Sequence, residues 1–425
     1  MKLHIEFEEY DLDNGLHLIL HRDNRVPIVA VNLWYKVGSK NEQIGKTGFA
    51  HLFEHMMFQG SEHVPADMHF QLIQSVGGTL NGSTFFDRTN YFETLPSNYL
   101  ELGLWLESDR MGYLLPAMTQ EKLDTQRDVV KNERLQRVDN QPYGLWFEKI
   151  LELAYPENYP YHWPVIGYMQ DLDNATLDDI NQFFNTYYAP NNATLVLTGD
   201  IDIKKTIKLV TKYFDEIPAG PSVPSQNFLF EINKASEKRI TLYDKVQLPR
   251  LYIGYHIPKH GSQELYITDV ITDLFSQGRS GRLYQELVFN KQVAQDANAF
   301  ILPMQETSMI IFIVTGKPDS DLGVLEKLVD TEIGKLQNDV ITDEELQRVK
   351  NQLEARKIRE LQSVSTKADN LNLFSTYFNN PGLINDEILR YEEITKQDIQ
   401  NITQTYLVKE NKIVLEFYPE LNHKS

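Results

Sequence analysis

Residues 29–37 read VAVNLWYKV and residues 251–257 read LYIGYHI, and these two stretches decide the fold. In both, every second residue is apolar, and Val31 in the first corresponds to Leu251 in the second, 220 positions later. Apolar residues that alternate with a period of two are typical of a half-buried β-strand. The two stretches therefore predict equivalent strands in two copies of one unit.

A second pair of segments repeats at nearly the same offset. An Asp-Ile pair, a Tyr and an Asn within 179–192 recur at the same spacing within 398–411, 219 positions later. A short apolar strand follows each segment, at 195–197 and 413–415. Two independent matches at one offset indicate an internal duplication.

The middle of the chain has the composition of a connector. Residues 216–236 contain three prolines and a glycine between two patterned regions. We therefore expect an N-terminal domain at 1–215, a linker at 216–236 and a C-terminal domain at 237–425. In each half, the sequence pattern predicts strands, a helix, a strand, several helices and a closing strand. This order favours an α+β fold, with helices packed on a mainly antiparallel sheet.

Composition excludes several classes of function. The chain has 425 residues, with 60 Asp and Glu against 41 Lys and Arg, and a net charge of −19. Such a surface repels phosphate groups, so we expect no nucleic-acid partner, and cationic ligands are favoured. Cysteine is absent, which excludes disulfides, thiolate metal ligands and Cys nucleophiles. Any transition metal would have to be held by His and carboxylate groups.

No apolar run in the sequence approaches the roughly 18 residues that a membrane span requires. The first residues, MKLHIE, lack the apolar core of a signal peptide. We therefore expect a cytoplasmic protein, or a periplasmic one if a leader peptide was removed from the sequence.

A metal site is indicated by His51-Leu52-Phe53-Glu54-His55. Thr47 is expected to cap a helix through about Phe58, and histidines four residues apart lie on one face of such a helix. Both imidazoles could then reach one cation, with the carboxylate of Glu54 beside them. The alternative is a pair of surface or hydrogen-bonded core histidines. A third ligand is needed to decide between the two.

A helix predicted from Thr119 to about Arg137 offers that ligand. Glu133 continues its apolar stripe of Leu123, Val129 and Val130, so its carboxylate is expected to point towards the core. A buried carboxylate is unfavourable unless it is neutralised, paired or bound to a metal. The alternatives are a metal site and a salt bridge to a neighbouring arginine, for which the candidates are Arg127, Arg134 and Arg137.

Together these motifs resemble the pitrilysin/insulinase family of inverted-zincin (HxxEH) zinc metallopeptidases. The resemblance rests on His51-x-x-Glu54-His55, on Glu133 78 positions after His55, and on several further motifs along the chain. Those motifs are 140–144 (NQPYG), 198–200 (TGD) and 278–284 (GRSGRLY). The family's duplicated α/β roll would explain the repeat, which implies two homologous α/β-roll domains.

The resemblance also implies roles for the site residues. His51, His55 and Glu133 would bind Zn²⁺, and Glu54 would be the catalytic base of a zinc endopeptidase that acts on unfolded peptides. Many relatives have a second glutamate seven residues before the third ligand. Here that position is Gln126, which can form hydrogen bonds but cannot act as a base.

Residues 78–84 (GTLNGST) resemble the family's active-site edge strand. We expect Asn81, Gly82, Ser83 and Thr84 to bind substrate, because a polar edge strand can pair with an extended peptide through its main chain. The alternative is an ordinary hairpin with a glycine bulge. Relatives commonly have Ala at the position of Gly82.

The second half lacks the metal motif. Thr268, Ile271 and Thr272 align with His51, Glu54 and His55, so we expect one Zn²⁺ per chain. Single-chain relatives carry an Arg and a Tyr in their C-terminal half that hold substrate and the developing oxyanion. Here Val288 and Gln295 occupy those positions. The chain therefore resembles the zinc-bearing subunit of a heterodimer, with a homodimer as the second choice.

Two other functions are alternatives to peptide hydrolysis. Some members of the family are non-catalytic core or assembly subunits, but those generally lose metal ligands or the base, and this sequence keeps all four residues. Zinc storage or sensing would leave Glu54 without a purpose. The sequence therefore favours a zinc metalloendopeptidase.

Overall fold

The computed structural model describes residues 4–224, 230–232, 236–338 and 341–420. The chain forms two compact units, and each unit draws on both halves of the sequence. The expected domains 1–215 and 237–425 correspond to the two copies of the sequence repeat. The compact units differ from them, because each unit includes a segment from the other half of the sequence. Part of the expected linker 216–236 lies outside the described residues. Unit 1 comprises Met1–Arg134, Trp163–Asn227 and Ile358–Asp386, and unit 2 comprises Leu135–His162, Phe228–Lys357 and Glu387–Ser425.

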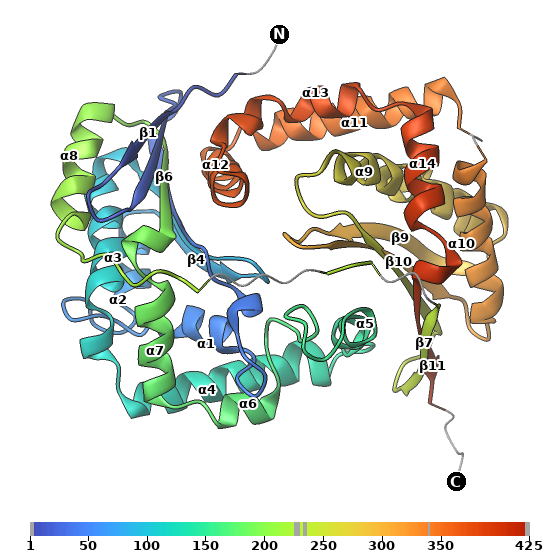
Figure 1. Cartoon of the computed structure of the whole chain (residues 1–425), viewed down its shortest axis with the longest axis horizontal. Coiled ribbons are helices and arrows are strands. Elements are labelled where there is room, and N and C mark those ends of the chain that lie inside the picture. Colours follow the sequence, from blue (N-terminus) through green and yellow to red (C-terminus); the bar gives the residue numbers. More distant parts are fainter. Residues whose placement is uncertain (1–3, 225–229, 233–235, 339–340, 421–425) are drawn as a thin grey trace. The chain divides into compact units, whose positions relative to one another are not determined.

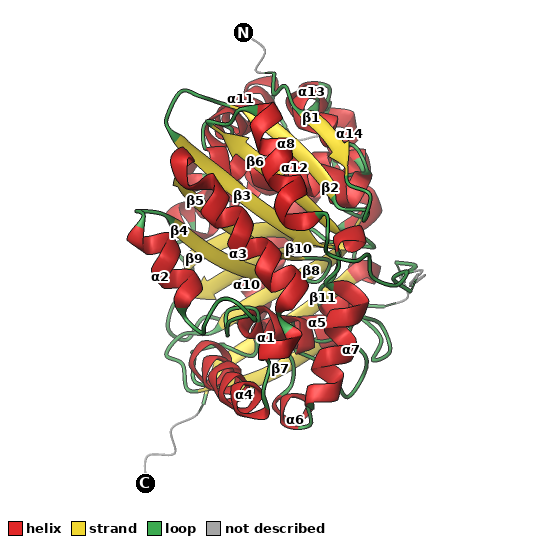
Figure 2. Ribbon diagram, turned by 90° about the vertical axis from the view of Figure 1, so that its left-hand side faces the viewer, coloured by secondary structure: helices red, strands yellow, loops and turns green. Residues whose placement is uncertain are grey.

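The sheet of unit 1 contains six strands among the described residues, in the order β1-β2-β6-β3-β5-β4 (Figure 2). All neighbouring strands pair antiparallel except β2 and β6, which are parallel. Strand β4 forms one edge, because it pairs only with β5. The strands are β1 Glu8–Asp11, β2 His17–Arg22, β3 Ile28–Tyr35, β4 Thr79–Thr84, β5 Thr89–Pro96 and β6 Ala193–Gly199.

The sheet of unit 2 repeats this pattern with five described strands, in the order β7-β11-β8-β10-β9. Again one pair, β7 with β11, is parallel and the others are antiparallel. The strands are β7 Lys238–Asp244, β8 Arg250–Ile257, β9 Ala294–Leu302, β10 Ser308–Gly316 and β11 Lys412–Pro419.

Helices cover these sheets within each unit (Figure 1). In the described part of the chain no helix is long and apolar enough to cross a membrane. The α-helices of unit 1 are α1 Phe49–Met56, α2 Met68–Ser75, α3 Leu100–Tyr113, α4 Gln120–Arg134, α6 Met169–Asp173, α7 Leu177–Tyr187, α8 Ile203–Phe214 and α12 Val364–Phe378. Those of unit 2 are α5 Trp146–Ala154, α9 Gln263–Ser276, α10 Leu322–Gln337, α11 Asp343–Glu360, α13 Glu387–Glu392 and α14 Lys396–Tyr406.

The α+β class and the two similar domains predicted from the sequence are confirmed by this architecture. The repeated segments 179–192 and 398–411 fold in the same way. Each helix begins with a capping box, Thr176 with Asp179 in α7 and Thr395 with Asp398 in α14. After each helix an asparagine side chain donates a hydrogen bond to the carbonyl oxygen of the helix's last residue, at 2.8 Å and 2.7 Å.

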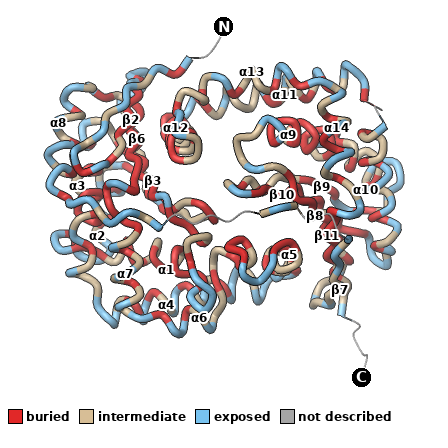
Figure 3. The backbone as a smooth tube through the Cα atoms, in the orientation of Figure 1, coloured by how far each residue is buried: buried red, intermediate tan, exposed pale blue. Residues whose placement is uncertain are grey.

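Strands β3 and β8 are buried on both faces, so the expectation of half-buried strands was wrong (Figure 3). In unit 1, α3 packs on one side of the sheet and α12 contacts β3 and β6. In unit 2, α10 and α5 contact β8, and Trp146 of α5 stacks on Tyr252 with ring centroids 4.9 Å apart. A second layer of helices therefore explains why residues at odd and even positions are equally buried.

The second layer comes from the opposite half of the sequence in each unit. Helix α12 belongs to the second half but packs in unit 1, and α5 belongs to the first half but packs in unit 2. In unit 1, Thr198 donates a hydrogen bond to the carbonyl oxygen of Val364, and the buried amine of Lys367 pairs with Asp23. These contacts close unit 1 with a helix that is distant in the sequence.

Candidate metal centre

Helix α1 presents the candidate ligands, and its first turn is held by a neighbouring loop. It begins after Gly48, which has a left-handed backbone (φ 83°) and no side chain that could cap. The expectation that Thr47 caps this helix was therefore wrong. The Thr47 hydroxyl instead donates to Oδ2 of Asp171, at 2.6 Å, and accepts from the backbone N–H of Tyr168.

The start of α1 is capped by Glu42, a residue that sequence reasoning missed. Its carboxylate accepts hydrogen bonds from the backbone N–H groups of Gly48 and Ala50, at 2.9 Å and 2.8 Å, and from the indole of Trp163. Burial raises the pKa of Glu42 well above its usual range, while these three donors favour the ionised form. The start of α1, two residues before His51, is thus anchored by a buried carboxyl group.

Helix α4 supplies the third candidate ligand. Leu123, Gln126 and Val130 are buried on one face and Glu133 continues that face, whereas Val129 is 42% exposed and does not belong to it. The side chain of Glu133 is 16% exposed, so it is less buried than the sequence suggested.

Basic side chains on α4 attach the helix to the segment 167–175. Arg127 and Arg134 donate to the carbonyl oxygens of Ala175 and Gly167, at 2.6 Å and 2.7 Å, and Lys131 pairs with Asp173. These contacts fix α4 beside α1, with which it packs.

His51, His55 and Glu133 converge on one point between the two helices. Oε2 of Glu133 lies 3.3 Å from Nε2 of His55 and 3.7 Å from Nε2 of His51, and one donor atom from each residue lies within 4.8 Å of the others. Donors about 2 Å from a tetrahedral cation are about 3.3 Å apart, so this set fits Zn²⁺. Two imidazoles and a carboxylate are also a usual catalytic zinc set. It is the single such cluster of His and acidic groups in the described residues.

Glu54 lies beside the cluster but is held by a strand. Its Oε2 accepts a hydrogen bond from the Thr84 hydroxyl of β4, at 2.6 Å. Burial raises the pKa of the Glu54 carboxyl, and the hydrogen bond from Thr84 partly opposes this effect. A raised pKa makes the ionised carboxylate a stronger proton acceptor.

Strand β4 passes directly over Glu54. A Cβ placed on Gly82 would lie 3.1 Å from Cγ and 3.2 Å from Oε1 of Glu54, so the backbone approaches the carboxylate closely. Ser83 faces the other side of the sheet and donates to Asn90, and Asn81 is exposed. The predicted substrate-binding residues thus lie on an edge strand, where Gly82 and Thr84 face the site and Asn81 and Ser83 do not.

The same loop that caps α1 also holds the β4–β5 hairpin. The backbone N–H groups of Ser39 and Lys40 donate to the carbonyl oxygens of Phe85 and Phe86, at 3.2 Å and 2.9 Å. The Trp163 indole donates to both Ser39 and Glu42. The loop therefore keeps the base on α1 and the strand above it in one rigid arrangement.

The equivalent place in unit 2 has different chemistry. Thr268, Ile271 and Thr272 are buried in α9, and both threonine hydroxyls donate to carbonyl oxygens within the helix. The buried residues of α11, Leu346, Val349 and Leu353, match Leu123, Gln126 and Val130 of α4, which places Arg356 at the position of Glu133. Arg356 pairs with Asp273 of α9 at 3.2 Å. An ion pair therefore stands where unit 1 has the cluster of candidate ligands.

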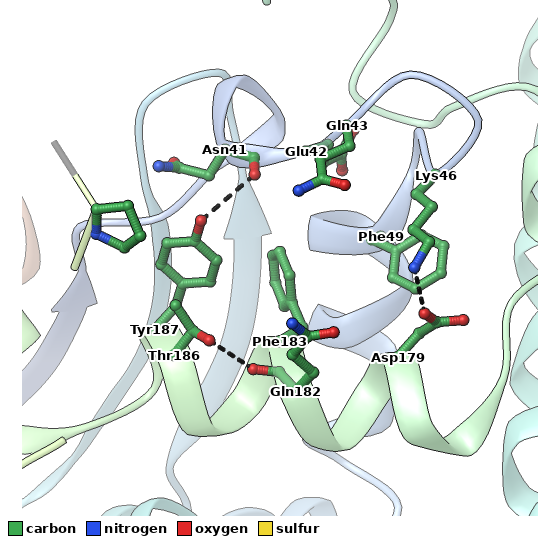
Figure 4. A pocket seen from close by; sticks show the side chains of 11 residues that line it. Asn41, Glu42, Gln43, Lys46, Phe49, Asp179, Gln182, Phe183, Thr186 and Tyr187 are labelled. Atoms are coloured by element: carbon green, nitrogen blue, oxygen red, sulfur yellow. Dashed lines mark hydrogen bonds and ion pairs between the residues drawn. The ribbon is translucent and has the colours of Figure 1, made fainter. Parts of the chain in front are cut away.

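A separate pocket of unit 1 lies at the start of α1 (Figure 4). Its volume is about 220 Å³, and it lies between the 41–46 loop and α7. Phe49 and Phe183 face it, Lys46 pairs with Asp179 at its rim, and Tyr187 donates to the carbonyl oxygen of Asn41. None of the three converging ligands lines this pocket, so it is distinct from the candidate metal centre.

Two family models match successive parts of the chain. Residues 18–163 match the family model described as Insulinase (Peptidase family M16), and residues 174–353 match the one described as Peptidase M16 inactive domain. A zinc protease of Helicobacter pylori, PqqE, is 32% identical over 373 residues, which cover 87% of this chain and 83% of PqqE. The chain belongs to the M16 family of peptidases. The resemblance to pitrilysin and insulinase is thereby confirmed.

Further M16 relatives extend over nearly the whole chain. The uncharacterized zinc protease YmxG of Bacillus subtilis is 23% identical over 361 residues, which cover 85% of this chain and 86% of YmxG. The crystal structure of a protease from Helicobacter pylori matches with a TM-score of 0.93 and 28% identity, and covers 98% of this chain and 100% of that chain. A peptidase M16 inactive domain from Pseudomonas fluorescens has the same fold (TM-score 0.87, 16% identity, 99% of both chains).

The two M16 models divide the candidate site from the second repeat. His51, Glu54, His55 and Glu133 all lie within the residues matched by the insulinase model. The inactive-domain model matches the part in which Thr268 and Thr272 replace the histidines. The inactive-domain match extends over α7, β6 and α8 of unit 1 as well as part of unit 2, and it contains none of the four candidate site residues.

Proposed function

We propose that this M16 protein is a zinc-dependent endopeptidase that hydrolyses unfolded peptides. The observation that carries the proposal is the convergence of His51, His55 and Glu133, with Glu54 beside them under an edge strand. His51, His55 and Glu133 would hold Zn²⁺, and the ion would polarise a peptide carbonyl and make water more acidic.

Glu54 has the position of a general base. Because Thr84 occupies Oε2, the free oxygen Oε1 is the one that would accept a proton from water and return it to the leaving amine. Partial burial limits the access of bulk water to this carboxylate. These features favour hydrolysis over simple metal storage, in which Glu54 would have no function.

The open edge of β4 would bind the substrate. An extended peptide could add to this edge through main-chain hydrogen bonds, which gives affinity with little dependence on side chains. Only extended, unfolded segments can pair in this way. The acidic chain, with a net charge of −19, favours cationic peptides.

We also propose that the chain acts as the zinc-bearing subunit of a heterodimer. Val288 is packed against the core of unit 2 and Gln295 is exposed on β9, and neither can supply the Arg and Tyr found in single-chain relatives. Such donors to a developing oxyanion contribute about 10²–10³ in rate. A homologous subunit that carries the Arg and Tyr would restore them, and a homodimer with two zinc sites is the second choice.

The test uses a quenched-fluorescent library of unfolded peptides. Zinc-loaded chain is assayed alone and with a homologous subunit that lacks the His-x-x-Glu-His motif, and its mass in solution is measured. We expect slow cleavage alone, a gain of about 10²-fold or more with the partner, and loss of both after chelation. Cleavage that persists without metal, or no cleavage in either sample, would contradict a zinc endopeptidase. Full activity of the chain alone would contradict the two-subunit proposal.

A further inference from the structure

We propose that Thr84 is a positioning residue that orients the Glu54 carboxylate and links it to the strand that receives the substrate. The proposal rests on the proposed peptidase function. It assigns to Thr84 a role that differs from contact with the peptide, because its side chain is directed at the base and not at the open edge of the sheet.

The first observation is how Glu54 is enclosed by β4. The hydroxyl of Thr84 donates to Oε2 at 2.6 Å, and the Cα of Gly82 packs against the same side chain near Oε1. Residues 82 and 84 are two apart, so both face the same side of the sheet. One carboxylate oxygen is therefore fixed by a hydrogen bond, while the other faces a residue without a side chain.

The second observation is the hydrogen-bond register of the hairpin. The backbone N–H of Phe85 donates to the carbonyl oxygen of Arg88, so Phe85 and Arg88 form a hydrogen-bonded pair. The next pair along the two antiparallel strands is Thr84 with Thr89. Because hydrogen-bonded and non-hydrogen-bonded pairs alternate, the main-chain groups of Thr84 and Gly82 point away from β5, towards the open edge. Thr84 thus meets an added strand with its backbone and Glu54 with its side chain.

The third observation is that Thr84 is itself held in place. Its partner Thr89 is buried and donates to the carbonyl oxygen of Val37, at 2.9 Å. The following residues, Phe85 and Phe86, accept hydrogen bonds from Ser39 and Lys40. A side chain attached to so constrained a backbone can hold a carboxylate in one orientation.

Orientation of the base matters because a small misplacement of a reacting group lowers the rate strongly, by up to about 10²-fold for 1 Å. Without the Thr84 hydroxyl, the Glu54 carboxylate could rotate about its terminal bond. Substrate affinity should change little, because the main chain of Thr84 would still pair with the peptide. The expected signature is a lower kcat with a nearly unchanged KM.

The test compares Thr84→Val, which removes the hydroxyl but keeps the shape, with Thr84→Ser, which keeps the hydroxyl. In the zinc-loaded protein with its partner subunit, Thr84→Val should lower kcat about 10-fold or more and change KM less than about 3-fold. Thr84→Ser should stay within about 3-fold of wild type. Thr211→Val, at an exposed position of α8, is the matched control and should behave like wild type.

Two further measurements separate positioning from folding and from the proposed function. Zinc content and the melting temperature should be the same in all variants, and Thr84→Ala replaces Thr84→Val if the latter is less stable. Crystal structures should show a rotated Glu54 carboxylate in Thr84→Val and the original orientation in Thr84→Ser, whether or not peptides are cleaved.

Three results would overturn the role of Thr84. They are an unchanged kcat in Thr84→Val while wild type cleaves, equal losses in Thr84→Val and Thr84→Ser, and an unmoved Glu54 in the Thr84→Val structure. If wild type cleaves no peptide, the proposed function fails, and the crystal structures alone then decide whether Thr84 orients Glu54.

Discussion

Helices α1 and α9 occupy the same position in the two repeated units, yet they have opposite surroundings. In α1, His51 and His55 project out of the helix and remain 14% and 22% exposed. In α9, Thr268 and Thr272 are buried and bond to their own helix. The same fold can therefore hold a helix that presents candidate metal ligands or one whose polar groups bond within the helix.

The neighbouring helices, α4 and α11, complete the contrast. Glu133 of α4 adds a third donor to two imidazoles, a set that a cation would stabilise. Arg356 of α11 pairs with Asp273, and this ion pair needs no metal. The two helix pairs thus differ at all three candidate ligand positions, and the third position holds a carboxylate in unit 1 and a guanidinium in unit 2.

The largest expected effect concerns the base. Glu54→Gln removes the proton acceptor but none of the three ligands, so peptide cleavage should fall by about 10²–10⁴-fold while zinc content stays at the wild-type value. Cleavage rates and elemental analysis of the same samples measure both quantities. Glu62→Gln changes an exposed carboxylate that does not belong to the cluster and should have no effect. A Glu54→Gln protein that cleaves at the wild-type rate would show that another group is the base.

The next effect concerns the residue that distinguishes α4 from α11. Glu133→Gln replaces the anionic ligand with a neutral amide, so the affinity for Zn²⁺ should fall about 100-fold or more. Competition with a chelator of known affinity measures the change. Glu121→Gln, exposed on the first turn of the same helix, is the control. If both variants bind Zn²⁺ equally well, Glu133 is not a ligand.

The two helix pairs show which parts of the fold and of the candidate site could be predicted from the sequence. The repeat, the strands and the pairing of His51 with His55 could be predicted, because periodicity and spacing are local properties of the chain. The role of Glu133 as third ligand came from the family resemblance, since the apolar stripe used to place it included the exposed Val129. The Arg356–Asp273 pair was missed, although matching the apolar stripe of α11 to that of α4 would have found it. Glu42 was missed because a capping residue usually lies next to its helix. Glu42 instead precedes Gly48 by six residues in the sequence.

The exchange of α5 and α12 between the units could not be predicted. An amphipathic pattern shows that a helix has a buried face but not which sheet covers it. For the same reason β3 was expected to be half-buried, since its second cover comes from residues more than 330 positions away. Local patterns therefore identified the elements, and the distant partners required the structure.

A smaller effect is the pH dependence of stability that the buried histidines outside the cluster of candidate ligands produce. Burial lowers the pKa of His69 in unit 1 to about 3 and that of His256 in unit 2 to about 4. Both are neutral in the folded state, so their stabilisation is complete above the unfolded pKa of about 6.5 and is lost as the pH falls to the folded value. For His256 the loss should reach about 3 kcal/mol at pH 4.

Urea unfolding of wild type and His256→Phe between pH 7 and pH 4 measures this contribution. The variant removes the titrating group from an aromatic environment that includes Tyr155 and Phe230. It should lose less stability than wild type over this range. Equal slopes for the two proteins would mean that His256 does not titrate with a lowered pKa.

The smallest effect tests the ion pair in unit 2. Arg356→Met leaves the Asp273 carboxylate, which is 9% exposed, without this cation and should lower the free energy of unfolding by about 1–2 kcal/mol. Zinc content should not change, because the pair lies in unit 2. Arg359→Met on the same helix is exposed and should change stability by less than about 0.5 kcal/mol. A loss of zinc in Arg356→Met would contradict the separation of the two sites.

Counting zinc ions per chain tests the central claim most directly, namely that unit 1 holds a metal site and unit 2 does not. The wild-type protein is purified without chelators, supplied with Zn²⁺, dialysed and measured by elemental analysis. We expect about one zinc per chain, lost in His51→Ala and retained in Thr268→Ala. No bound zinc after Zn²⁺ is supplied, or two zinc ions per chain with one that survives in His51→Ala, would contradict it.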